Sequence, residues 1–63
     1  MILENINRRC SERGLTLYAL EKETGIGNGI IAKWKNNSPS VKNLKKVADY
    51  FGCTVDELLR EDE

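Results

Sequence analysis

Apolar residues recur at intervals of three and four along nearly the whole chain, which is the spacing of helix faces. Leu3, Ile6 and Cys10 form such a stripe near the N-terminus. The pattern predicts five helices and no strand, over about residues 2–13, 17–24, 27–35, 40–51 and 54–59. We expect the inward positions of these helices to be largely buried: Ile6, Leu20, Ile31, Trp34, Leu44, Ala48 and Leu58.

Residues that cap helices stand at the ends of these segments. Thr16 is a suitable N-cap, and Thr54 with Glu57 has the spacing of a capping box. Gly14, Gly25 and Gly52 follow three of the apolar stripes, where a left-handed glycine ends a helix. The caps and the apolar spacing therefore predict the same boundaries, and they favour an all-α fold.

Residues 16–37 combine a short helix, a glycine-containing turn and a second short helix. Ile30, Ile31 and Trp34 share one face of the second helix. The opposite face is small, polar and free of acidic residues, and it contains Asn28, Gly29, Ala32, Lys33 and Asn36. A helix anchored by its apolar side and presenting such a face can enter the major groove of DNA.

A chain of 63 residues has room for one domain, residues 1–63, with a small core. No apolar run approaches the roughly 20 residues of a membrane span. The first residues alternate apolar and charged side chains, unlike a signal peptide. We therefore expect a cytoplasmic protein without a membrane partner.

The sequence offers little for catalysis or metal binding. It has two cysteines, Cys10 and Cys53, and no histidine, so it lacks a four-ligand Cys/His zinc site and the usual base of a nucleophilic enzyme. The glycines of residues 25–29 lack the preceding strand and following lysine of a nucleotide-binding loop. We expect no enzyme, no cofactor and no small-molecule substrate. Two reduced, buried cysteines are favoured over a disulfide.

Charge is unevenly distributed although the formal net charge is zero. Residues 26–46 contain five lysines and no acidic residue, whereas residues 47–63 contain six acidic residues and one arginine. Attraction to phosphate depends on local potential more than on net charge. The lysine segment coincides with the predicted groove-binding helix, so DNA binding is favoured over a merely solvated surface.

These features together resemble a helix-turn-helix domain of the lambda-repressor/Cro type, the XRE family. The similarity covers about residues 3–59, and its most specific parts are GIGNGIIAKWKN (residues 25–36) and PSVKNLKKVADYFGCTVDELL (residues 39–59). The resemblance implies a compact five-helix domain. Its second and third helices would form the helix-turn-helix, and the third, residues 27–35, would lie in the major groove.

Four residues are candidates for base contacts. Asn28 can bond adenine, or it can cap the third helix. Gly29 would let the backbone approach DNA closely. The alternative, a glycine that arose by neutral drift in a short helix, fits the sequence nearly as well. Lys33 can donate to guanine or phosphate, or remain solvated. Ala32 can touch a thymine methyl or simply keep the helix slim. Stacking by Trp34 is less favoured than core packing.

The resemblance implies DNA-backbone contacts from the loop after the third helix and from the start of the fourth. In this chain the corresponding residues are Asn36, Asn37, Ser38 and Lys42. Family members usually begin the second helix with a phosphate-binding Gln, which is Leu17 here. We expect Thr16 and Tyr18 to replace that contact.

Two further departures affect one another. The usual small alanine on the inner side of the second helix is Glu21. Many members pair an arginine of the first helix with a glutamate after the third, but Cys10 and Lys35 stand there. Because an acid and a base have changed together, one hypothesis is a partly buried Glu21–Lys35 pair. The alternative is a solvent-exposed Glu21.

The favoured function is a sequence-specific, DNA-binding transcriptional regulator, of the kind of a prophage-type repressor of a bacterium. It would bind double-stranded DNA as a homodimer, joined by its last helix and the surface near the loop after the third. Activation is equally compatible with these residues. The alternative is a protein-interaction module, such as an antitoxin or anti-repressor-like partner, whose acidic last helix and tail bind a basic protein.

Overall fold

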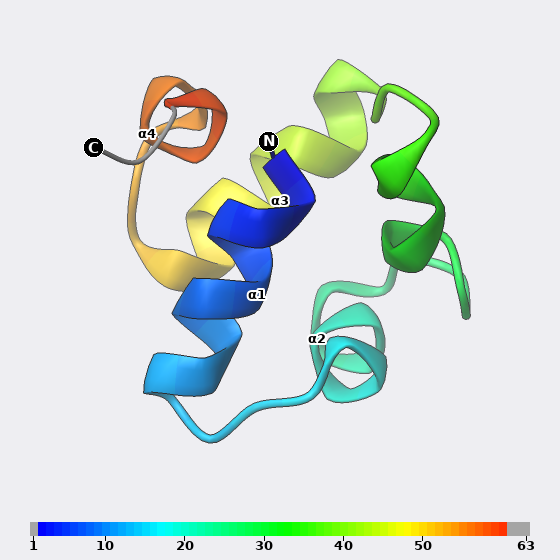
Figure 1. Cartoon of the computed structure of the whole chain (residues 1–63), viewed down its shortest axis with the longest axis vertical. Coiled ribbons are helices and arrows are strands. Elements are labelled where there is room, and N and C mark those ends of the chain that lie inside the picture. The colour runs from blue at the N-terminus through cyan, green and yellow to red at the C-terminus, as the bar shows by residue number, and fades with distance from the viewer. Residues whose placement is uncertain (1, 61–63) are drawn as a thin grey trace.

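The computed structural model describes residues 2–60, and in that range the chain is all-helical. It has four α-helices and one 3₁₀-helix, so the prediction of a fifth α-helix is wrong (Figure 1). The elements in order are α1 (Ile2–Glu12), α2 (Leu17–Thr24), η1 (Ile31–Lys35), α3 (Val41–Phe51) and α4 (Val55–Leu59). The predicted acidic tail, residues 61–63, lies outside the described residues.

Capping residues confirm the predicted starts of the second, fourth and fifth helices and the predicted ends of the second and fourth. The hydroxyl oxygens of Thr16, Ser40 and Thr54 each accept a hydrogen bond from the backbone N–H three residues later. Thr54 takes part in a complete capping box. Gly25 and Gly52, at φ of 78° and 70°, end α2 and α3 in the left-handed conformation that favours glycine.

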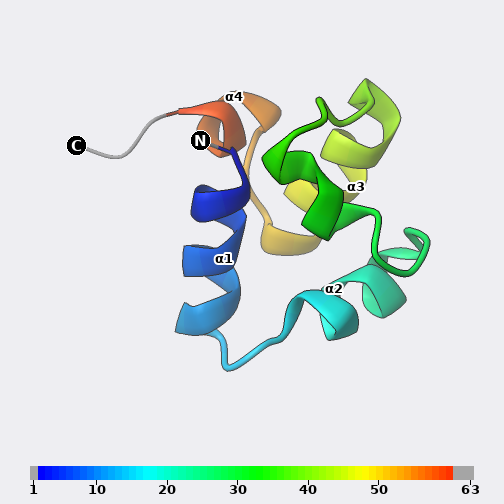
Figure 2. The same cartoon turned by 45° about the vertical axis from the view of Figure 1, so that its right-hand side comes forward.

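The core forms where the helix faces meet. Helix α1 packs against α2, η1 and α4, and α3 packs against α2 and α4 (Figures 1 and 2). All seven residues predicted to be buried are buried: Ile6, Leu20, Ile31, Trp34, Leu44, Ala48 and Leu58. Burial of such side chains is the main stabilising contribution available to a chain of this length.

The third predicted helix is shorter and tighter than expected. Gly29 has a φ of 82°, which a right-handed helix does not allow, so residues 27–30 form a turn and the helix begins after Ile30. The N–H of Ile30 donates to the carbonyl of Gly27 (3.2 Å), and the N–H of Lys33 donates to that of Ile30 (3.2 Å). Asn28 therefore precedes the helix and does not cap it.

A buried asparagine joins the two ends of the chain. The side-chain amide of Asn5 donates to the main-chain oxygens of Glu57 (3.2 Å) and Arg60 (3.1 Å). Its oxygen accepts a hydrogen bond from Nε of Arg9 (2.8 Å). These bonds satisfy carbonyls at the end of α4 that have no partner within so short a helix. They also set the register of α1 against α4.

The cysteines are both free thiols: Cys10 is buried and Cys53 is half-buried. Burial raises the pKa of the Cys10 thiol, and the positive charge of Arg13 opposes that rise.

Within residues 2–60, no helix has the length and apolar character needed to cross a membrane.

Candidate nucleic-acid interface

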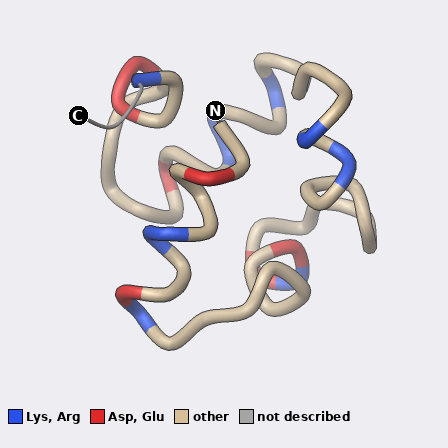
Figure 3. The backbone as a smooth tube through the Cα atoms, viewed as in Figure 1, with Lys and Arg blue, Asp and Glu red and all other residues tan. Residues whose placement is uncertain are grey.

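The predicted DNA-contacting residues lie at the surface, between the N-cap of α2 and the first turn of α3. Nine are exposed, and Gly29 is partly exposed; the exposed ones are Thr16, Tyr18, Asn28, Ala32, Lys33, Asn36, Asn37, Ser38 and Lys42. Figure 3 shows lysine positions and no acidic position from η1 into the first turn of α3. The structure therefore leaves this basic segment accessible.

The 3₁₀ geometry of η1 separates its buried and exposed sides. With three residues per turn, Ile31 and Trp34 fall in one row, and both are buried. The exposed positions of η1 and its C-cap are Ala32, Lys33, Lys35 and Asn36. Lys35 shares a row with Ala32 and so points to solvent. The sequence had instead suggested a partly buried Lys35 paired with Glu21.

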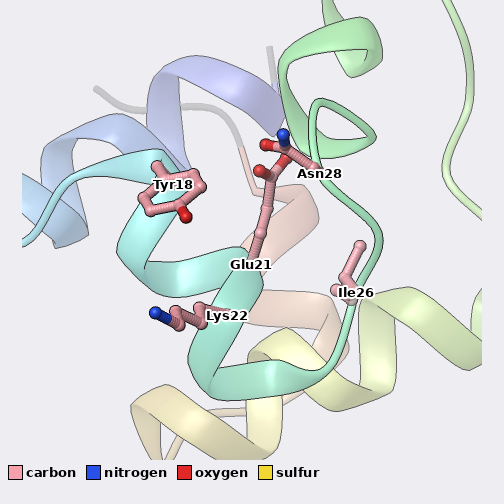
Figure 4. A pocket seen from close by; sticks show the side chains of 5 residues that line it. All are labelled: Tyr18, Glu21, Lys22, Ile26 and Asn28. Atoms are coloured by element: carbon pink, nitrogen blue, oxygen red, sulfur yellow. The ribbon is translucent and has the colours of Figure 1, made fainter.

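Glu21 is buried and does not pair with Lys35. Only 3% of its surface is exposed. Its Oε2 accepts a hydrogen bond from the N–H of Ile31 (2.9 Å), and its Oε1 accepts one from the N–H of Gly29 (3.0 Å). The predicted pair is therefore wrong, and so is the solvent-exposed alternative. Figure 4 shows the Glu21 side chain extending from α2 toward the turn that carries Asn28.

Side chains of α2 and of the turn line an open pocket of about 220 Å³ (Figure 4). Tyr18, which is 61% exposed, and Asn28 are among the residues that line it. The Lys22 ammonium lies 6.0 Å from the centroid of the Tyr18 ring, at the outer limit of a cation–π contact. Lys22 is a basic residue that sequence reasoning left out, although its spacing of four from Tyr18 places both on one side of α2.

The loop after η1 presents side chains to solvent, while part of its backbone is occupied. The N–H groups of Asn36 and Asn37 donate to the carbonyl of Lys33, at 3.1 and 3.0 Å. They close the end of η1 and are not available to phosphate. The side chains of Asn36, Asn37 and Ser38 are exposed. Lys42 is exposed on the first turn of α3, directly beyond this loop.

The two acidic residues in the second half of α2 differ in their surroundings. Glu21 faces two N–H dipoles and is shielded from solvent. Glu23 is exposed on α2. Among residues 2–60, no three potential ligands of the Cys, Asp or Glu type gather at a metal-binding site. The site is therefore a basic protein surface with polar side chains suited to an anionic partner.

Comparison with known proteins agrees with this geometry. The family model of the Cro/C1-type HTH DNA-binding domain matches residues 5–61. The match begins inside α1, at Asn5, and covers the four later helical elements completely. Curated proteins and solved structures gave no significant match. The match confirms the resemblance that was based on the turn and on the last two helices. The chain belongs to the Cro/C1-type helix-turn-helix family of DNA-binding domains.

Proposed function

We propose that this protein is a sequence-specific transcriptional regulator, a repressor of the prophage type, that places η1 and the turn before it in the major groove of its operator. The observation that carries the proposal is the two-sided character of η1. Ile31 and Trp34 fix the helix to the core, and Ala32 and Lys33 face outward in a segment rich in lysine and free of acid. Repression would follow from occupying an operator that overlaps a promoter.

The base contacts are assigned to the turn and to the exposed rows of η1. Asn28 is exposed and its side chain has no capping role, which leaves its amide for adenine. Lys33 is assigned to guanine, and Ala32 to a thymine methyl. The left-handed Gly29 has open space where a side chain would start, so DNA can approach its backbone.

The phosphate contacts are assigned to both sides of η1. Their role is to set the orientation of the domain on the duplex, without selecting sequence. On one side they come from the start of α2, through Thr16 and Tyr18. On the other side they come from the loop and α3, through Asn36, Asn37, Ser38 and Lys42. The exposed Lys35 adds to the attraction for phosphate.

We further propose that two copies bind paired half-sites. A single module of this kind has an interface of about 600–1,000 Å², which seldom supports tight binding alone. The dimer surface is assigned to α4 and to the surface near the loop after η1. Leu59 is 52% exposed there and borders a groove that also contains Ile2, Trp34 and Pro39. Half-sites would then lie about one or more helical turns apart.

Selection of bound sites from random DNA tests the proposal. We expect enrichment of two similar half-sites. The affinity should fall steeply as salt rises: the logarithm of the binding constant should decrease with the logarithm of salt concentration by about 0.9 for each phosphate contact. Placing the selected operator over a reporter promoter or upstream of it then distinguishes repression from activation. No enriched sequence, together with binding insensitive to salt, would favour the protein-interaction alternative.

A further inference from the structure

Glu21 binds both ends of the turn that precedes η1. Its main-chain oxygen accepts hydrogen bonds from the N–H groups of Gly25 and Ile26, the latter at 3.0 Å. Its carboxylate accepts from the N–H groups of Gly29 (3.0 Å) and Ile31 (2.9 Å). One residue of α2 therefore closes the turn at its start and at its end.

The turn has few other anchors. Three of the five residues from Gly25 to Gly29 are glycine, which loses more backbone freedom on folding than any other residue. Ile26 is buried, but Gly27 and Asn28 are exposed. Hydrogen bonds to an ionised carboxylate are shorter and stronger than neutral ones, especially away from water. Besides the hydrogen bond from the N–H of Ile30 to the carbonyl of Gly27 (3.2 Å), the Glu21 carboxylate restrains the second half of the turn and ties it to α2.

The same carboxylate supports the first turn of η1. The N-cap residue of η1, Ile30, provides no side-chain hydrogen bond. The first N–H groups of a helix need a partner from elsewhere, and Glu21 supplies it for Ile31. Because η1 spans only five residues, the point at which Ile31 is held fixes where Ala32 and Lys33 project.

From this geometry we infer that Glu21 is a positioning residue for DNA recognition: its carboxylate holds the Gly27–Ile30 turn and the start of η1 in the conformation that meets the bases. The inference rests on the proposed function. Its prediction is opposite to that of simple electrostatics. Removing a negative charge near DNA relieves repulsion of the phosphates and should by itself tighten binding. A positioning role predicts weaker binding to the operator instead.

The test compares Glu21→Gln with Glu23→Gln, which removes the same charge from an exposed position of the same helix. A glutamine has one acceptor oxygen, so it can accept only one of the two hydrogen bonds and places an NH₂ group against the other donor. Affinity would be measured for the selected operator and for scrambled DNA of equal length.

We expect Glu21→Gln to bind the operator about tenfold more weakly, a change of about 1.4 kcal/mol. Its binding to scrambled DNA should be unchanged or tighter, because phosphate contacts remain. Glu23→Gln should bind both DNAs as the wild type does, or slightly more tightly. Equal operator affinity for the two variants would overturn the inference. If Glu21→Gln lost affinity equally for both DNAs, and the loss matched the fraction of the variant that is unfolded, the inference would also be overturned.

Amide hydrogen exchange in the wild-type protein gives a second measurement that does not depend on DNA or on the variant's folding. The N–H groups of Gly29 and Ile31 should exchange more slowly than that of the exposed Asn28. If Gly29 exchanges as fast as Asn28, the restraint is absent and the inference fails. A wild-type protein with no preferred DNA sequence would overturn the proposed function, whereas Glu21→Gln with full operator affinity would overturn the role of Glu21 alone.

Discussion

Arg13, just beyond α1, contacts Phe51, the last residue of α3, in two ways. Its guanidinium donates a hydrogen bond to the main-chain oxygen of Phe51 (3.1 Å) and lies 4.9 Å from the centroid of the Phe51 ring. The carbonyl at a helix end lacks an intrahelical partner, and a cation there also meets the negative end of the helix dipole. One side chain therefore joins the ends of two helices that carry most of the core.

Replacing Arg13 with alanine should lower the free energy of unfolding by about 1–2 kcal/mol, because it removes a charge-assisted hydrogen bond and a cation–π contact. Urea denaturation followed by circular dichroism measures the change. Lys45→Ala is the control, since Lys45 is an exposed cation on α3. An equal loss in both variants would mean that general charge, and not the Phe51 contact, matters at Arg13.

Asn5→Ala should cost about 2 kcal/mol of stability, because the carbonyls of Glu57 and Arg60 lose a buried donor. Asn7→Ala changes the same residue type at an exposed position of the same helix and should cost less than about 0.5 kcal/mol. Thermal or urea unfolding compares the two. If both variants are as stable as the wild type, the link between α1 and α4 contributes nothing to the fold.

Glu57 makes stability dependent on pH in the acid range. The backbone N–H of Thr54 donates to its carboxylate (2.8 Å), and this bond lowers the pKa of the Glu57 carboxyl below its ordinary 4.5. A group with a depressed folded pKa stabilises above its unfolded pKa, and that contribution is lost as pH falls through the folded value.

Between about pH 5 and about pH 3, the unfolding free energy of the wild type should therefore fall more steeply than that of Glu57→Gln. Urea titrations at several pH values give the slope. Carbon NMR of the Glu57 carboxyl gives the pKa directly. A titration midpoint at or above 4.5 would contradict the role assigned to the capping box.

Two lysines should affect DNA binding differently. Lys33→Ala removes a proposed base contact. At one position of each half-site, the free-energy difference between the preferred base and the others should therefore shrink by about 1–3 kcal/mol. Lys42→Ala removes a proposed phosphate contact, so it should weaken all sequences similarly and reduce the salt slope by about one per module. Binding to the selected operator and to scrambled DNA measures both.

An equal loss for both DNAs in Lys33→Ala would mean that Lys33 contacts phosphate. If neither variant changes binding, η1 is not the element that contacts DNA. Circular dichroism of each variant provides the folding control, since both lysines are exposed and their removal should leave the core intact.

The sequence by itself determined the ends of α2, α3 and α4. Each begins after a hydroxyl that accepts from the third N–H after it, and α2 and α3 end at a glycine that adopts positive φ. The buried face was equally predictable, because apolar spacing reports which side of a helix must leave water. Ile6, Leu20 and Trp34 are examples.

The tertiary structure decided how η1 is formed and held. Helical spacing in residues 27–35 was compatible with an α-helix, but Glu21 draws the N–H groups of Gly29 and Ile31 toward α2, and Gly29 takes a left-handed conformation. In sequence, a glutamate on the inner side of α2 can be buried, paired or exposed. Only the packing of α2 beside the turn selects the backbone N–H groups as its partners.

The same holds for the links made by Asn5 and Arg13, whose partners lie 38 to 55 residues away in the chain. A local pattern specifies which groups need a partner, because helix ends always leave carbonyls and N–H groups unsatisfied. It does not specify which distant side chain reaches them. That choice depends on the distance and angle between packed helices, which arise only when the whole core has formed.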